Sequence, residues 1–100
     1  MDYRVNSESG CVVHIGGRLT FNDFDRMRGM VGDVGRRSDS RVVFDLSTLD
    51  FIDSSGLGML LIASEELGKK DKTLALRGAR GQVQKVLAVA ELGRVLEIEG

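Results

Sequence analysis

The stretch with the clearest chemical potential is Asp53-Ser54-Ser55-Gly56, which stands between a predicted buried strand and a predicted amphipathic helix. The first N–H groups of a helix have no partners within it, and the helix dipole is positive at that end. A serine there can cap the helix, and a phosphoserine would be stabilised there. On spacing alone, the simpler interpretation is a capping segment, with an Asp or Ser N-cap and Gly56 at a tight turn.

Other kinds of active site find little support in the residues. A serine nucleophile needs a nearby base, but the only histidine, His14, lies in the first predicted hairpin, and the G-x-S-x-G pattern is absent. Cys11 and His14 are three residues apart on a predicted strand, so they point to opposite faces and do not form a metal site. The segment 78–81 has a G-x-x-G pattern, but a simple turn is favoured because stacking aromatics are lacking. We therefore expect no catalytic residue, no metal and no cofactor.

The composition is that of a single folded domain. The chain has 100 residues, of which 42% are hydrophobic and 29% charged, with a formal net charge of −1 that is spread evenly. Such a balance argues against nucleic-acid binding. One cysteine cannot form an internal disulfide, and neither a long apolar run nor a signal-peptide core is present. We expect a monomer in the cytoplasm without a membrane partner.

The elements that must position the serines alternate along the chain in the order β-β-α-β-α-β-α-β. Strands are predicted at residues 3–5, 11–15, 41–46, 73–76 and 95–98, with a turn at Ser7-Glu8-Ser9-Gly10 and a change of direction at Gly16-Gly17. This order indicates an α/β domain whose single sheet is mixed, largely parallel and about five-stranded. Right-handed crossovers would place the three helices mainly on one face.

The first predicted helix follows Asn22, a plausible N-cap. Its apolar stripe consists of Phe24, Met27, Val31 and Val34. Gly29 and Gly32 lie inside this helix, and each costs roughly 1 kcal/mol relative to alanine. We expect the helix to be held mainly by packing.

The second predicted helix begins at the serines and ends near Gly68. One face should pack on the sheet and comprises Leu57, Leu60, Leu61, Ser64 and Leu67. Met59, Ile62 and Glu66 are predicted to project from the opposite side, in line with Ser55. Exposed apolar residues beside the serines are candidates for partner contact, although two such residues are also common on any surface.

The third predicted helix ends at Gly93 and turns four residues inward: Val83, Val86, Leu87 and Ala90. Loops after the carboxyl ends of parallel strands form the usual binding edge of such a sheet. Residues 51–56 should lie at this edge, with Asp45 nearby as support for the loop.

Two segments carry a family resemblance: Val42-Val43-Phe44-Asp45-Leu46, and Leu49-Asp50-Phe51-Ile52-Asp53-Ser54-Ser55-Gly56-Leu57-Gly58. They resemble the signature of the anti-sigma factor antagonists, the STAS domain in its stand-alone bacterial form. The similarity covers nearly the whole chain, including the element order and the Gly17-Arg18-Leu19 segment. Its specific part is the D-S-S-G-L-G core.

The resemblance implies a partner switch rather than an enzyme. The unphosphorylated antagonist would bind an anti-sigma factor that is also a serine kinase and so release the sigma factor. Phosphorylation of Ser54, the serine directly after the Asp, would end the complex, and a PP2C-type phosphatase would reset it. Asp53, Ser55, Gly56, Met59 and Ile62 would contact the partner.

One departure from the family concerns the segment after Gly17-Arg18-Leu19. The family often has an acidic residue there, where this chain has Thr20, and Asp23 would substitute for it in partner binding. Two alternatives stay open. The chain could be a STAS subunit of a lipid ABC or anion transporter, or a weak nucleotide-binding or nucleotide-hydrolysing domain whose GTP or ATP turnover would vanish with Ser54→Ala.

Overall fold

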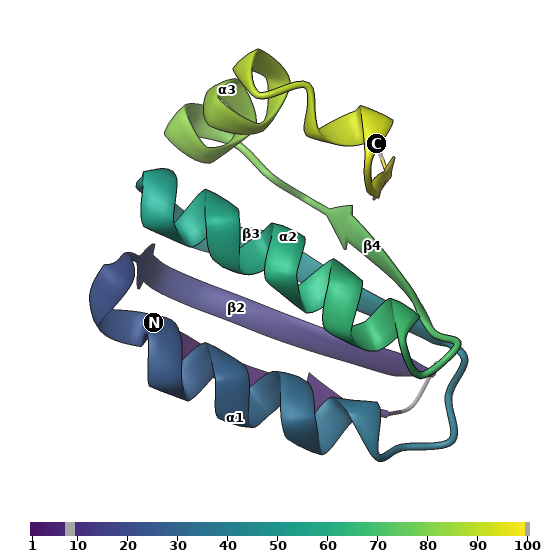
Figure 1. The fold of residues 1–100 in the computed structure, drawn as a ribbon. Coiled ribbons are helices and arrows are strands. Elements are labelled where there is room, and N and C mark those ends of the chain that lie inside the picture. Colours follow the sequence, from purple (N-terminus) through teal and green to yellow (C-terminus); the bar gives the residue numbers. More distant parts are fainter. Residues whose placement is uncertain (8–9, 100) are drawn as a thin grey trace.

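A computed structural model describes residues 1–7 and 10–99 as one five-stranded sheet with helices packed against it (Figure 1). Of the predicted turn at Ser7-Glu8-Ser9-Gly10, Glu8 and Ser9 lie outside the described residues. The elements in chain order are β1 (Asp2–Asn6), β2 (Cys11–Leu19), the 3-10 turn η1 (Phe21–Asp23), α1 (Phe24–Gly35), β3 (Arg41–Ile52), α2 (Ser54–Gly68), β4 (Thr73–Arg77), α3 (Gly81–Val89), the 3-10 turn η2 (Leu92–Arg94) and β5 (Glu97–Glu99).

The strands lie in the order β1-β2-β3-β4-β5, so each strand pairs with its neighbour in sequence. β1 is antiparallel to β2, and the other three pairings are parallel. α1 and α2 lie side by side in front of β2 and β3, with α3 beside α2 (Figure 1). The predicted fold class, a mixed and largely parallel sheet with three helices on one face, is confirmed.

The core lies between the sheet and the helices. Alternate residues of β2, β3 and β4 point to the helices, and the largest fully buried side chains include Phe44, Ile15, Leu19, Met30, Leu46 and Leu60. On the opposite face of the sheet, the buried apolar cluster of the described residues consists of Val12, Val43 and Ala75. None of the described helices is long and apolar enough to cross a membrane.

β2 and β3 are both longer than predicted. β3 runs to Ile52 instead of Leu46, with one extra residue between its partners of His14 and Gly16 and another between those of Gly17 and Arg18. These bulges break the period-2 alternation on which the prediction depended. Gly16-Gly17 does not redirect the chain; it stays within β2, where a Cβ on Gly16 would lie 2.9 Å from the hydroxyl oxygen of Thr48.

The predicted helix ends and faces need three corrections. Asn22 is not an N-cap but lies inside η1, whose N-cap Thr20 forms a capping box with Asp23, and Asp23 in turn is the N-cap of α1. Within α1, Met27, Val31 and Val34 are buried as predicted, together with Met30, but Phe24 is 45% exposed. α3 ends at Val89, so Ala90 is exposed while Val83 and Leu87 are buried.

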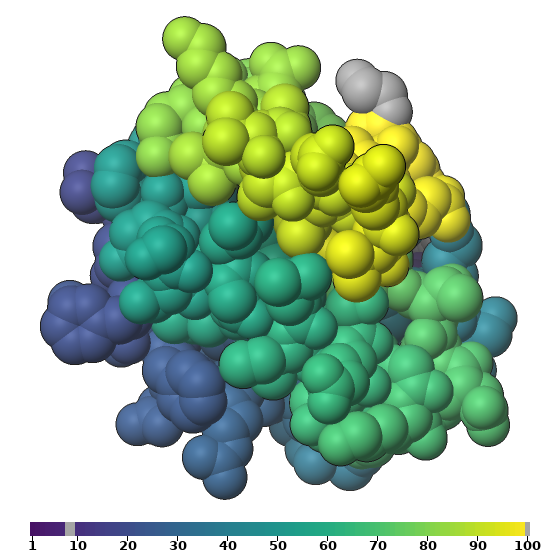
Figure 2. Space-filling model, turned by 45° about the horizontal axis from the view of Figure 1, so that its top comes forward, coloured from purple at the N-terminus to yellow at the C-terminus, as the bar shows by residue number. Residues whose placement is uncertain are grey.

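α2 does not have the single buried face that the sequence predicted. Met59, predicted to project outward, is only 4% exposed, whereas Leu61, predicted to face the sheet, is 36% exposed. α2 lies in the middle of the helical layer, between α1 and α3 (Figures 1 and 2). Because α1 covers one flank, the buried residues of α2 face both the sheet and α1. These buried residues are Gly56, Met59, Leu60, Ala63 and Leu67. Ile62 and Glu66 are exposed, as predicted.

Candidate functional site

Asp53 is the N-cap of α2 and fixes the start of this helix. Its backbone is extended, and its Oδ1 accepts a hydrogen bond from the Gly56 N–H at 2.7 Å. Its own N–H donates to the Leu19 carbonyl oxygen at 3.3 Å, which ties the helix entrance to the end of β2. The Asp53 carboxylate therefore serves the fold in this conformation, and the capping interpretation holds with Asp as the cap.

Gly56 is required by close packing and not by a tight turn. It is the third residue of α2, and it is buried. A Cβ at this position would lie 2.5 Å from the Leu19 carbonyl oxygen and 2.7 Å from Cγ1 of Ile52. The helix can approach the ends of β2 and β3 this closely only because the side chain is missing.

Ser54 and Ser55 are the first two residues of α2, and both side chains are exposed. Their backbone N–H groups lie in the first turn, where a helix offers no internal acceptor, and the Asp53 carboxylate accepts from the Gly56 N–H instead. Two hydroxyls thus stand in solvent at the positive end of the α2 dipole. This arrangement can accept an anionic group on a serine without displacing a core residue.

The connection from β2 to α1 lies beside the serines, because Leu19 is bonded to Asp53 and η1 contacts α2. Thr20 is half-buried, and the Asp23 carboxylate accepts hydrogen bonds from the Thr20 N–H at 2.9 Å and from the amino group of Met1 at 3.1 Å. Burial pushes the pKa of Asp23 upward, but these hydrogen bonds outweigh it and hold the pKa below its usual value. Thr20 and Asp23 therefore flank the Asp53–Gly56 segment.

The second half of β3 extends beyond β4, and there its backbone bonds with side chains from the β4–α3 connection and from the first turn of α3. The Gln82 side chain accepts from the Ile52 N–H at 3.0 Å and donates to the Ile52 carbonyl oxygen at 2.8 Å. Nε of Arg80 donates to the Ser47 carbonyl oxygen at 2.6 Å. Gln82 thus fixes the backbone immediately before Asp53, a role that no sequence pattern indicated.

Asp45 does not lie near the serines as predicted, because β3 continues for seven residues beyond it. Its carboxylate accepts hydrogen bonds from the Ser47 N–H at 2.9 Å and from Nε of Arg77 at 3.0 Å, and His14 Nδ1 lies 3.8 Å away. Burial opposes ionisation, but the bonds from Ser47 and Arg77 outweigh it and lower the pKa of Asp45. Asp45 supports the open face of the sheet and the end of β4.

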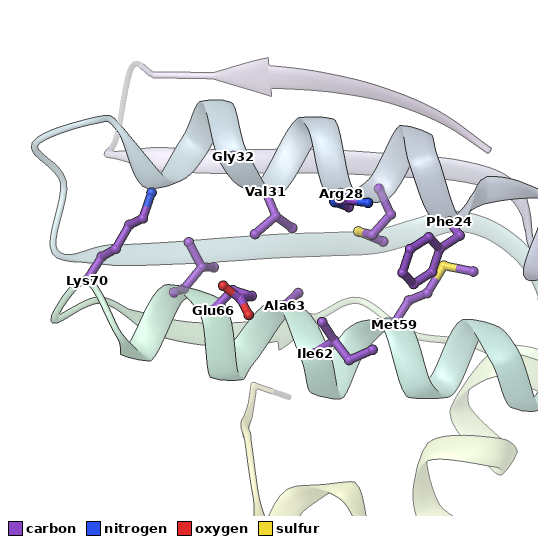
Figure 3. A pocket seen from close by; sticks show the side chains of 11 residues that line it. Phe24, Arg28, Val31, Gly32, Met59, Ile62, Ala63, Glu66 and Lys70 are labelled. Atoms are coloured by element: carbon purple, nitrogen blue, oxygen red, sulfur yellow. The ribbon is translucent and has the colours of Figure 1, made fainter.

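Apolar side chains continue from the serines along the outer surface. Phe21 in η1 is 67% exposed, and Ile62 on α2 is 48% exposed. Met59 lies beneath this surface, between α1 and α2, with the Phe24 ring beside it (Figure 3). The structure therefore brings Ile62 near the candidate site as a surface residue and places Met59 in the interior. It adds Phe21, to which the sequence analysis gave no role, and Phe24, which the sequence analysis assigned to the buried stripe of the first helix.

Comparison with known proteins assigns the family. A family described as "Mlab, STAS domain" matches residues 4–97, so the chain belongs to the STAS domain family. A STAS-domain containing protein of Pseudomonas aeruginosa is 29% identical over 86 residues, which are 86% of this chain and 84% of that protein. An anti-sigma F factor antagonist of Paenibacillus polymyxa is 27% identical over 88 residues, covering 87% of this chain and 75% of that protein.

Solved structures agree with this assignment. An anti-sigma factor antagonist from Mycobacterium paratuberculosis superimposes with a TM-score of 0.83 and 25% identity, over 97% of this chain and 83% of that chain. A sulfate transporter family protein from Wolinella succinogenes has the same fold, with a TM-score of 0.73 and 21% identity over 87% and 73% of the two chains. The chain is thus a STAS domain that resembles anti-sigma factor antagonists at low identity, and transporter STAS domains share its fold.

Proposed function

We propose that this chain is a phosphorylation-switched anti-sigma factor antagonist and not an enzyme. In its unphosphorylated form it binds an anti-sigma factor that is also a serine kinase, which frees the sigma factor. The kinase then phosphorylates Ser54, the complex dissociates, and a PP2C-type phosphatase restores the binding form. The matches to antagonists from Paenibacillus polymyxa and Mycobacterium paratuberculosis support this proposal, which also has the chain acting as a cytoplasmic monomer.

The observation that carries the proposal is the exposure of Ser54 at the first position of α2, with the Asp53 carboxylate already engaged by the Gly56 N–H. A kinase can reach this hydroxyl without unfolding the domain. Gly56, two residues after Ser54, is by contrast buried against Leu19 and Ile52 and cannot be reached by a kinase. Of this segment, the two serines alone combine a hydroxyl with an accessible position.

The switch follows from charge and not from refolding. Phosphate on Ser54 adds about −1.5 to −2 charges at neutral pH, and the positive end of the α2 dipole stabilises that charge within the domain. A partner docked over Ser54, Ile62 and Phe21 would have to bury the new charge against an apolar surface. A loss of about 3 kcal/mol in binding lowers the affinity more than a hundredfold, which suffices for a switch.

Phosphorylation mapping tests the proposal. The purified chain is incubated with ATP and each serine-kinase-like anti-sigma factor encoded in the same genome, and the modified residue is identified by mass spectrometry. We expect a single phosphoserine at Ser54, none in Ser54→Ala, and normal modification in Ser55→Ala. Modification of Ser55 instead, or no modification by any of these kinases, would contradict the proposal.

A second candidate function is that of a regulatory subunit of a transporter. The shared fold of the sulfate transporter family protein from Wolinella succinogenes favours it. In that case the chain would co-purify in a stoichiometric complex with a transporter protein or its ATPase, and Ser54→Ala would leave the complex intact. The intact D-S-S-G segment at an exposed helix start favours the antagonist.

A further inference from the structure

α1 and α2 are separated by an open groove with a volume of about 540 Å³ (Figure 3). Its lining is mainly apolar and includes Phe24, Val31, Met59, Ile62, Ala63 and Leu67. Phe24 and Ile62 remain 45% and 48% exposed, so the chain itself does not cover them. The groove starts at Phe24 and Met59, one helical turn beyond Ser55, and runs toward the carboxyl ends of both helices (Figure 3).

Gly32 keeps the groove open on the α1 side. A Cβ at this position would meet only a terminal nitrogen of Arg36, at 3.8 Å, so the missing side chain is not required by packing within the domain. Glycine destabilises a helix interior relative to alanine, and nothing in α1 itself calls for it here. The empty volume at Gly32 is therefore space that an external side chain can fill.

Two cations, Arg28 and Lys70, line the groove beside its apolar residues. Within the described residues, Arg28 and Lys70 have no carboxylate partner, whereas the third charged lining residue, Glu66, pairs with Lys69 at 3.4 Å. The Lys70 side chain extends toward Gly35 of α1, where an added Cβ would lie 3.0 Å from Nζ of Lys70. Arg28 and Gly35 are seven residues apart on α1, or about 10 Å along its axis.

We propose that this groove binds an acidic amphipathic helix of a partner protein. From Met59 to Lys70 the groove follows α2 for about 16 Å, which is three turns of a bound helix. The apolar lining fits a helix face with residues at i, i+4 and i+7. Arg28 and Lys70 fit two carboxylates on that helix about seven residues apart. A fatty acid would satisfy only one of these cations, because it carries a single carboxylate.

The proposal extends the proposed function, since it rests on the chain acting by binding a protein partner. It places a second contact beside the serines: a partner helix in the groove would end next to Ser54, where phosphate could repel it. The groove does not take part in phosphorylation, however, and its occupation can be measured with no kinase present.

Selection from a displayed library of 14-residue helical peptides tests the groove. The library is enriched on the wild-type chain, and the selected peptides are then measured against Gly32→Leu, which fills the groove, and Gly29→Leu. Gly29 lies one turn earlier on α1 and does not line the groove, and a Cβ there would have nothing within 4 Å, so it is a matched control. Ile62→Asp, at an exposed position, provides a second disruptive variant that keeps the core intact.

We expect peptides with three apolar residues at helical spacing and two acids about seven residues apart. Their affinity should fall at least tenfold with Gly32→Leu and with Ile62→Asp, and should change less than twofold with Gly29→Leu. Peptides that bind the wild type and Gly32→Leu equally would overturn the proposal. It would also be overturned if dodecanoate alone bound the groove, or if Gly32→Leu abolished a wild-type dimer in sedimentation. If no kinase phosphorylates Ser54 but the peptides still bind the groove, the phosphorylation switch is rejected and the groove proposal stands.

Discussion

Gly56 shows how one residue sets the position of the candidate site. A methyl group there would overlap the Leu19 carbonyl oxygen and Ile52, so the start of α2 would have to move away from the sheet. We expect Gly56→Ala to lower the free energy of unfolding by about 2 to 3 kcal/mol, the cost of overpacking. Urea denaturation measures this. Gly58→Ala is the matched control, because its Cβ would have nothing within 4 Å, and it should be neutral or stabilise by up to about 1 kcal/mol.

Gln82 holds the backbone of Ile52 through both its amide atoms. We expect Gln82→Ala to cost about 1 to 2 kcal/mol, because a part-buried N–H loses its acceptor. The Ile52 amide should also exchange its hydrogen faster, which NMR can follow. Gln84→Ala on the same helix is exposed and should change stability by less than about 0.5 kcal/mol. An equal hydrogen-exchange rate of the Ile52 amide in both variants would show that Gln82 does not hold the end of β3.

At the scale of elements, α1 contains a glycine that its own packing does not need. Gly29 is exposed on α1, and a Cβ there would contact nothing within 4 Å. We expect Gly29→Ala to raise the free energy of unfolding by about 1 kcal/mol, since alanine loses less backbone entropy on folding. Thermal denaturation followed by circular dichroism measures the change. A lower melting temperature would mean that Gly29 has a packing role absent from this structure.

The open face of the sheet joins β2, β3 and β4 through His14, Asp45 and Arg77. Because the pKa of Asp45 is lower in the folded chain, its ionised form stabilises the fold above its unfolded pKa, near 4, and this contribution is lost as pH falls through the folded value. Asp45→Asn should therefore flatten the loss of stability on acidification below about pH 4, as measured by urea unfolding at several pH values.

Asp50→Asn is the control for this pH dependence. Its carboxylate is 67% exposed and pairs with Arg80 at 3.3 Å. An exposed pair of this kind contributes little. If both variants showed the same pH profile, the ion pair across the open face would not be the source of the acid sensitivity.

For the whole molecule, the sequence predicted the element order, the single sheet, the helical face and an exposed Ser54. Each of these depends on local periodicity or on the spacing around Asp53-Ser54-Ser55-Gly56. Three features could not be predicted because they arise between elements. The two bulges lengthen β3 past Asp45, α1 covers Met59, and Gln82 reaches Ile52 from a distant helix. A helical wheel assigns one inward face, whereas α2 packs against both the sheet and α1.

The most direct test of the switch is the affinity of the kinase-type anti-sigma partner for this chain with and without phosphate on Ser54. Stoichiometrically phosphorylated protein and the unmodified chain are compared by calorimetry, and amide NMR spectra of both report the fold. We predict at least a hundredfold weaker binding after phosphorylation, with spectral changes confined to the start of α2 and the neighbouring 20–24 segment. Equal affinity of the two forms, or unfolding of α2 on phosphorylation, would contradict the account.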